Sequence, residues 1–103
     1  MKKVRLNPSD LEAIIDTFES LFLPEDHLWL FGSRADETRK GGDIDLFIES
    51  SLALEELYKK KLEFSRVVQD KIGEQRIDIV IYCFGSPSLP IHLEARTTGI
   101  RLK

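Results

Sequence analysis

The sequence predicts a small α+β domain in which helices pack on a mixed β-sheet. Two segments, residues 11–22 and 54–72, carry apolar residues at helical spacing. Three shorter apolar segments, residues 27–31, 44–48 and 76–82, have the length and the composition of strands. A short loop joins the first two strands and a helix joins the last two, so the sheet is expected to combine antiparallel and parallel pairing.

The first helix is expected to begin within residues 7–10 and to end before Pro24. Pro8 suits the first turn of a helix, and Ser9 with Glu12 fits a capping box. One apolar stripe follows at helical spacing and is expected to face the core; it consists of Leu11, Ile14, Ile15, Phe18, Leu21 and Phe22.

The segment 27–31 is apolar on both faces after His27, which is typical of a strand covered on both sides. His27 itself is expected at the surface. A short helical turn is expected in the polar segment 34–40, with Ser33 as its cap. Free backbone N–H groups at such a turn would face a phosphate. Cationic side chains would add to this contact, or else belong to a solvated loop; they are Arg34, Arg39 and Lys40.

The second helix is expected over residues 52–72 and is expected to stop at Gly73. A third strand over 76–82 and a third helix over 88–97 follow, and residues 100–102 form either a brief final strand or a tail. The second helix should present one broad apolar face to the core; it consists of Leu54, Leu57, Tyr58, Leu62, Phe64, Val68 and Ile72.

Two carboxylates at the start of the second strand indicate a functional site. Because side chains alternate along a strand, Asp43 and Asp45 share one face, about 6.6 Å apart along the backbone. Neighbouring carboxylates repel each other unless a cation or a proton lies between them. Mg²⁺ together with substrate phosphates is the usual occupant of such oxygen sites. A solvated strand end is the alternative for an isolated Asp-x-Asp.

The connections bring further residues to the same end of the sheet. The short loop makes the first two strands antiparallel neighbours, so Gly32 and Ser33 lie beside Asp43. The helical connection makes the second and third strands parallel, with a right-handed crossover. Asp78, a charge inside an apolar strand, is therefore expected level with Asp43 and Asp45.

This order of features resembles the nucleotidyltransferase superfamily that includes DNA polymerase β. The shared pattern is an apolar strand ending in Gly32-Ser33, a spacer, Asp43-x-Asp45, and a carboxylate on a later strand, here Asp78. The whole chain looks like the small members called minimal nucleotidyltransferases. The resemblance implies the nucleotidyltransferase fold, α-β-loop-β-α-β-α, with a small mixed sheet of order 1-2-3 and helices packed on one face.

The resemblance also implies a chemistry, transfer of AMP from ATP to a hydroxyl group with two Mg²⁺ ions. It assigns three residues both to catalysis and to the metal ions, Asp43, Asp45 and Asp78, with Asp78 accepting the hydroxyl proton. It assigns three residues to phosphate binding, Gly32, Ser33 and Arg34.

A chain of 103 residues has no segment to spare for holding an acceptor. The resemblance implies a small helical HEPN-type ribonuclease as partner, silenced by AMP transfer to a Tyr, so that the chain is expected to be an antitoxin. Candidate docking segments are the loop 84–90 and the tail 99–103, with Phe84, Leu89 and Ile100 either as anchors or as core residues. An antitoxin that acts by binding alone and a nucleotidyltransferase for small molecules such as aminoglycosides are the alternatives.

Length, net charge and cysteine content narrow the classes of protein to which the chain can belong. The length predicts one domain over residues 1–103. A net charge of −3 argues against nucleic acid as a direct ligand and against an anionic membrane surface. Cys83 is the single cysteine, so no internal disulfide forms. No apolar run is long enough to span a membrane and the basic start lacks the apolar stretch of a signal peptide, so we expect a cytoplasmic protein. Self-association stays open.

Overall fold

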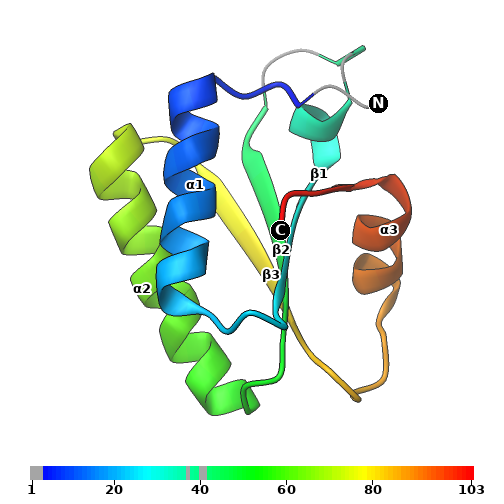
Figure 1. The fold of residues 1–103 in the computed structure, drawn as a ribbon. Coiled ribbons are helices and arrows are strands. Elements are labelled where there is room, and N and C mark those ends of the chain that lie inside the picture. The colour runs from blue at the N-terminus through cyan, green and yellow to red at the C-terminus, as the bar shows by residue number, and fades with distance from the viewer. Residues whose placement is uncertain (1–3, 37, 40–41) are drawn as a thin grey trace.

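The computed structural model describes residues 4–36, 38–39 and 42–103 of the chain (Figure 1). Helices and strands follow one another in the order that the sequence predicts. They are α1 (Pro8–Leu21), β1 (His27–Phe31), the 3₁₀ helix η1 (Gly32–Ala35), β2 (Ile44–Ser50), α2 (Leu54–Ile72), β3 (Ile77–Cys83), α3 (Pro90–Thr98) and β4 (Ile100–Arg101).

The four strands form one mixed sheet in the order β3-β2-β1-β4. β1 runs antiparallel to β2, and β2 runs parallel to β3 through the crossover helix α2. The predicted order 1-2-3 is therefore confirmed. β4 extends the sheet at the free edge of β1, where Trp29 pairs with Arg101, so the final residues form a short strand.

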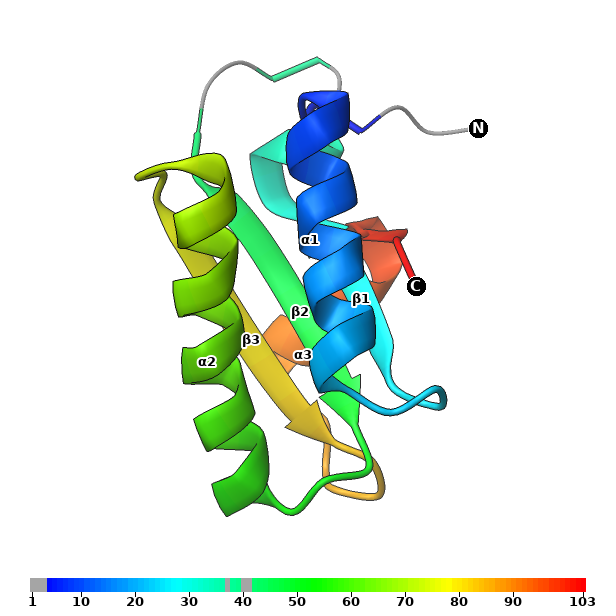
Figure 2. The ribbon, with the colours of Figure 1, turned by 60° about the vertical axis from the view of Figure 1, so that its left-hand side comes forward.

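Helices cover both faces of the sheet. α1 and α2 lie side by side on one face, and α3 lies on the opposite face (Figures 1 and 2). The expectation that all helices pack on one face is therefore wrong. The second face also carries apolar side chains that need cover. Phe47 of β2 and Phe31 of β1 point away from α1 and α2, and Ala95 of α3 packs on them.

The main core lies between the sheet and the pair α1 and α2. Alternate residues of β2 point into it, and the aromatic rings of Phe18, Phe22 and Phe64 contact one another there. Because β2 is covered on both faces, nearly all of its residues are buried. The strand that carries Asp45 is thus buried along nearly its whole length.

α1 begins two residues earlier than the predicted capping box requires. Asn7 is the N-cap, and its Oδ1 accepts a hydrogen bond from the backbone N–H of Ser9 at 2.8 Å. The expected box of Ser9 with Glu12 is therefore wrong, because Ser9 already lies inside the first turn. The helix ends at Leu21, before Pro24, as predicted.

The predicted apolar face of α2 is only partly buried. Its inner residues Leu57, Phe64 and Val68 contact the sheet and α1. Three of the predicted residues lie on another row of the helix, at i, i+4 and i+8, and remain more than half exposed; these are Leu54, Tyr58 and Leu62. Gly73 ends α2 with a positive φ of 85°, as predicted.

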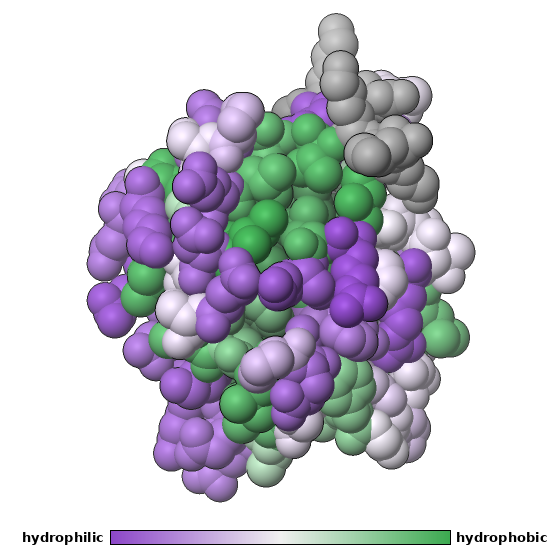
Figure 3. All heavy atoms as spheres, in the orientation of Figure 1, coloured by the Kyte–Doolittle hydropathy of each residue, from purple (hydrophilic) through white to green (hydrophobic). Residues whose placement is uncertain are grey.

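Apolar atoms also reach the surface between α1 and the C-terminal end of the chain (Figure 3). Several apolar side chains that pack against the core remain partly exposed, among them Ile100 and Leu102. In the described part of the chain, no helix has the length and apolar character needed to cross a membrane.

Candidate active site

The turn after β1 lies directly against the carboxylate of Asp45. Phe31 pairs with Asp45 in the β1–β2 register, so the chain leaves β1 beside that residue. Gly32 has a φ of +72°, a conformation that side chains disfavour. A Cβ at this position would also collide with Asp45 Oδ2. Only glycine lets the backbone come this close to the carboxylate.

Ser33 lies inside η1, and its residue surface is 7% exposed. Phe31 is the N-cap of η1 and has no side-chain cap bond, so the expectation that Ser33 caps this turn is wrong. The Arg5 guanidinium fixes the turn from outside, because its Nη2 donates to the Ser33 carbonyl at 3.0 Å and its Nε to the Asp36 carbonyl at 3.2 Å.

Arg34 holds the backbone on both sides of η1. Its Nη1 donates to the Arg5 carbonyl at 3.0 Å and its Nε to the Gly42 carbonyl at 3.3 Å. The predicted contact of Arg34 with phosphate stays a prediction. Arg39 lines the cleft described below, and the predicted contact of Lys40 falls outside the described residues.

The three predicted carboxylates lie at the same end of the sheet. Asp45 pairs with Asp78 in the β2–β3 register, and Asp43 precedes β2 by one residue. Burial raises the pKa of Asp45, and the nearby charges of Asp78 and Asp43 raise it further, with Arg39 opposing them. A cation beside Asp45 would relieve this repulsion.

Asp43 is paired with Arg76, whose Nε lies 3.3 Å from Asp43 Oδ2. Both side chains are well exposed. Asp78 is exposed on the edge strand β3 and is not among the residues that line the cleft. Among the described residues, no three His, Cys, Asp or Glu side chains are arranged to hold one ion. The oxygen donors of Asp43 and Asp45 nevertheless suit Mg²⁺.

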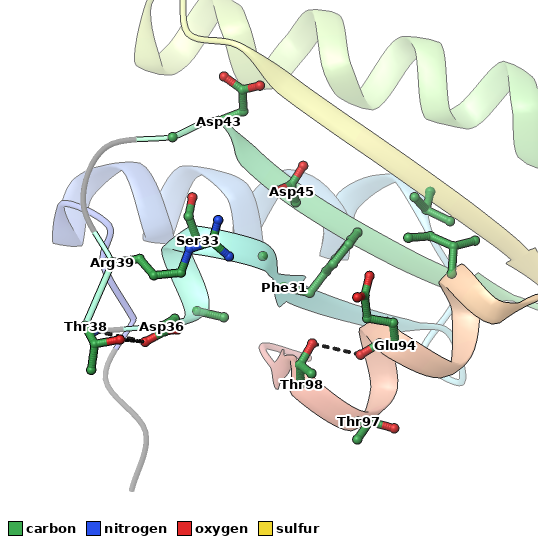
Figure 4. A pocket seen from close by; sticks show the side chains of 15 residues that line it. Phe31, Ser33, Asp36, Thr38, Arg39, Asp43, Asp45, Glu94, Thr97 and Thr98 are labelled. Carbon is green, nitrogen blue, oxygen red and sulfur yellow. Dashed lines mark hydrogen bonds between the residues drawn. The ribbon is translucent and has the colours of Figure 1, made fainter.

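An open cleft of about 940 Å³ extends from η1 across Asp45 to α3 (Figure 4). Its far wall is made by α3 and includes residues that sequence reasoning missed, because it placed no helix on this face of the sheet. The lining from β3 and α3 consists of Val80, Ile91, Glu94, Thr97 and Thr98.

A second group of polar side chains lies on the same face of the sheet, under α3. Glu49 of β2 accepts hydrogen bonds from Trp29 Nε1 at 2.8 Å and from Arg96 Nε at 2.7 Å, and His27 Nδ1 lies 3.2 Å away. Burial alone would raise the pKa of Glu49, but these hydrogen bonds, led by that from Arg96, lower it overall. The pair of Glu49 and Arg96 anchors α3 to the sheet.

Comparison with known proteins agrees with the fold. The family model for the nucleotidyltransferase domain matches residues 11–98. No curated protein sequence matches the chain significantly. Among solved structures, the chain is similar to one described as the crystal structure of the toxin–antitoxin MntA–HpeT, in a mutant with two aspartates changed to glutamate. The TM-score is 0.69 at 20% identity, covering 95% of this chain and 73% of that one.

Proposed function

The chain belongs to the nucleotidyltransferase domain family, and from that premise we propose that it transfers AMP from ATP to a hydroxyl group. One observation carries the proposal most directly. A positive-φ glycine turn is packed against Asp45, whose pKa is raised by burial and by two neighbouring carboxylates. Such a turn can bring backbone N–H groups close to phosphates. A cation would offset the repulsion that such a carboxylate experiences from its acidic neighbours.

Each residue has a defined role in this reaction. Gly32 and Ser33 would bind the β- and γ-phosphates, and Asp43 and Asp45 would hold Mg²⁺. Bound Mg²⁺ would neutralise charge on the phosphate oxygens. The acceptor oxygen forms a bond to the α-phosphorus, the bond to the bridging oxygen breaks, and pyrophosphate leaves. Asp78, exposed at the edge of the sheet, accepts the hydroxyl proton directly or through water.

The acceptor we propose is a Tyr of a HEPN-type toxin, so that the chain acts as an antitoxin. The similar solved structure is named as a toxin–antitoxin pair, and its two substituted aspartates lie two positions apart, as Asp43 and Asp45 do. Phe84 and Leu89 are 41% and 59% exposed, which suits the docking role predicted for their loop. Ile100 packs against the core and is not proposed as an anchor.

The test is incubation of the purified chain with Mg²⁺, ATP labelled at the α-phosphate and the HEPN-type protein encoded beside it. Mass spectrometry then locates the label. We expect AMP on one Tyr of the partner, and no transfer by the Asp43→Asn variant. Asp70→Asn is the matched control, because Asp70 is an exposed carboxylate in an ion pair with Arg66 on α2.

Other outcomes separate the alternatives. Neutralisation of the toxin by Asp43→Asn, with no label on the partner, would indicate an antitoxin that acts by binding alone. Label on an aminoglycoside-type small molecule, with none on protein, would replace the proposed acceptor. Neutralisation without label would contradict nucleotidyl transfer itself, whereas label on a small molecule would contradict only the proposed acceptor.

A further inference from the structure

The cleft is larger than the metal and phosphate groups require. Its volume of about 940 Å³ lies in the range of pockets that enclose a whole small molecule. Gly32, Ser33, Asp43 and Asp45 lie at one end, and α3 forms the opposite wall (Figure 4). A nucleotide with its phosphates at the first end must place its nucleoside in the remaining space.

The wall formed by α3 has the chemistry that a nucleoside needs. Ile91 is 38% exposed and lines the cleft together with Val80 of β3, so part of the wall is apolar. Glu94 extends from the middle of α3 into the cleft, near Phe31 (Figure 4). Within the described part of the chain, no hydrogen bond or ion pair engages the Glu94 carboxylate; Thr98 Oγ1 donates to the Glu94 backbone carbonyl instead, at 2.8 Å.

We propose that α3 forms the nucleoside subsite of this cleft and that Glu94 accepts hydrogen bonds from the ribose hydroxyls. The inference rests on the proposed function, which assigns the phosphates to Gly32 and Ser33 and the metal ion to Asp43 and Asp45. The ribose is the next group along the nucleotide. A carboxylate only accepts hydrogen bonds, so it repels phosphate and suits a vicinal diol, which offers two donors to its two oxygens.

The position of α3 is fixed before any ligand binds. Arg96 joins α3 to Glu49 of β2 through the 2.7 Å ion pair, and its guanidinium lies over the rings of Phe47 and Tyr82. His92 Nε2 lies 3.2 Å from the Ile81 carbonyl of β3. A wall held in place by its own contacts loses little conformational freedom on binding, which favours affinity.

The experiment compares four ligands as Mg²⁺ complexes by calorimetry: ATP, 2′-deoxy-ATP, 3′-deoxy-ATP and tripolyphosphate. The wild-type chain should lose about tenfold in affinity when a ribose hydroxyl is removed, as expected for a hydrogen bond to a charged group. Glu94→Gln should bind ATP about tenfold more weakly, lose its discrimination between the sugars, and bind tripolyphosphate unchanged. Glu63→Gln, which removes an equal charge from a half-exposed glutamate on α2, is the matched control.

Two results would overturn the inference. One is equal affinity of the wild-type chain for ATP and both deoxy forms, which needs no variant. The other is unchanged sugar discrimination in Glu94→Gln, with folding verified by a thermal melt. If the wild-type chain binds neither ATP nor tripolyphosphate, the proposed function itself fails, and the inference fails with it. Binding of tripolyphosphate and ATP without sugar discrimination leaves the proposed function standing and removes only the role of Glu94.

Discussion

Asp45 and Glu49 lie on the same face of β2 with Phe47 between them, and their surroundings differ in almost every respect. Glu49 receives hydrogen bonds from Trp29 and Arg96, and its pKa is lowered. Asp45 has two acidic neighbours, and its pKa is raised. Described residues donate hydrogen bonds to Glu49, whereas the described charges nearest to Asp45 are mainly the like charges of Asp78 and Asp43, so a cation from outside would stabilise Asp45. We therefore expect Glu49 to serve the structure and Asp45 to serve a ligand.

The most direct way to break this comparison is to remove the charge at Asp45. Asp45→Asn should weaken Mg²⁺-dependent ATP binding at least about a hundredfold, because even groups that only support metal ligands contribute ten- to a hundredfold. The same variant should melt at a higher temperature than the wild-type chain without metal, since it relieves repulsion from Asp43 and Asp78. Calorimetry and a thermal melt measure the two effects. Full ATP affinity in this variant would contradict the assignment.

Removing the charge at Glu49 should have the opposite pattern. Glu49→Gln leaves the partly buried charge of Arg96 without its partner, so we expect a loss of about 2–3 kcal/mol in the free energy of unfolding. Urea titration measures this loss. Affinity for tripolyphosphate should stay unchanged, because the side-chain hydrogen bonds that hold η1 come from Arg5 and Arg34 and not from Glu49 or Arg96. A stable variant with impaired tripolyphosphate binding would show that the two carboxylates do not divide the roles in this way.

Acid should sharpen the contrast, because the two pKa shifts act in opposite directions. The pKa of Glu49 lies below its ordinary value of 4.5, so its contribution is complete above that pH and is lost as pH falls through the lowered pKa. The pKa of Asp45 lies above its ordinary value of 3.8, so its carboxylate costs stability as pH rises through the raised pKa. Denaturation of the wild-type, Asp45→Asn and Glu49→Gln chains between pH 3 and 7 separates the two. We expect the free energy of unfolding of Glu49→Gln to fall less on acidification than that of the wild-type chain. Asp45→Asn should retain the wild-type fall.

The smallest effect should follow from Arg76, which pairs with Asp43. A cation that binds Asp43 must displace this exposed ion pair, and such pairs contribute about 0–1 kcal/mol. Arg76→Ala should therefore raise Mg²⁺ affinity about two- to threefold. Arg66→Ala is the matched control, because Arg66 forms an exposed ion pair with Asp70 on α2. Equal affinity changes in both variants would mean that long-range charge alone is responsible.

Local sequence patterns predicted the role of Asp45 in the site but not the role of Glu49 in the structure. Alternation along a strand is a short-range rule, so the sequence alone singled out Asp45 at the start of β2, together with Asp43 one residue before the strand. Glu49 was not singled out, because its main partner, Arg96, comes from α3. The sequence does not show which face of the sheet α3 crosses, and the expectation of helices on one face was wrong. Glu94 was not predicted as a site residue for the same reason, because it also belongs to α3.

The starts of the three longer strands were predicted to within a residue, because their apolar segments are bounded by glycine and charged residues, but β2 runs two residues beyond the predicted segment 44–48. The segment 27–31 coincides with β1, and 76–82 is shifted by one residue from β3. Helix caps and exposed helix rows were predicted less well. Asn7 and Ser9 are both good caps, and residue type alone does not decide between them. Spacing alone likewise could not tell that Leu54 and Tyr58 of α2 remain exposed.

The two walls of the cleft are joined by very different lengths of chain. Gly32 and Asp45 belong to one antiparallel pair closed by a short loop, whereas Glu94 reaches the cleft only after the whole crossover through α2 and β3. Closing the longer loop costs on the order of 1 kcal/mol more in chain entropy. α3 also buries only His92 and Ala95, while β2 is buried along nearly its whole length. Amide hydrogens of α3 should therefore exchange with solvent faster than those of β2, because local unfolding of the less buried element costs less free energy.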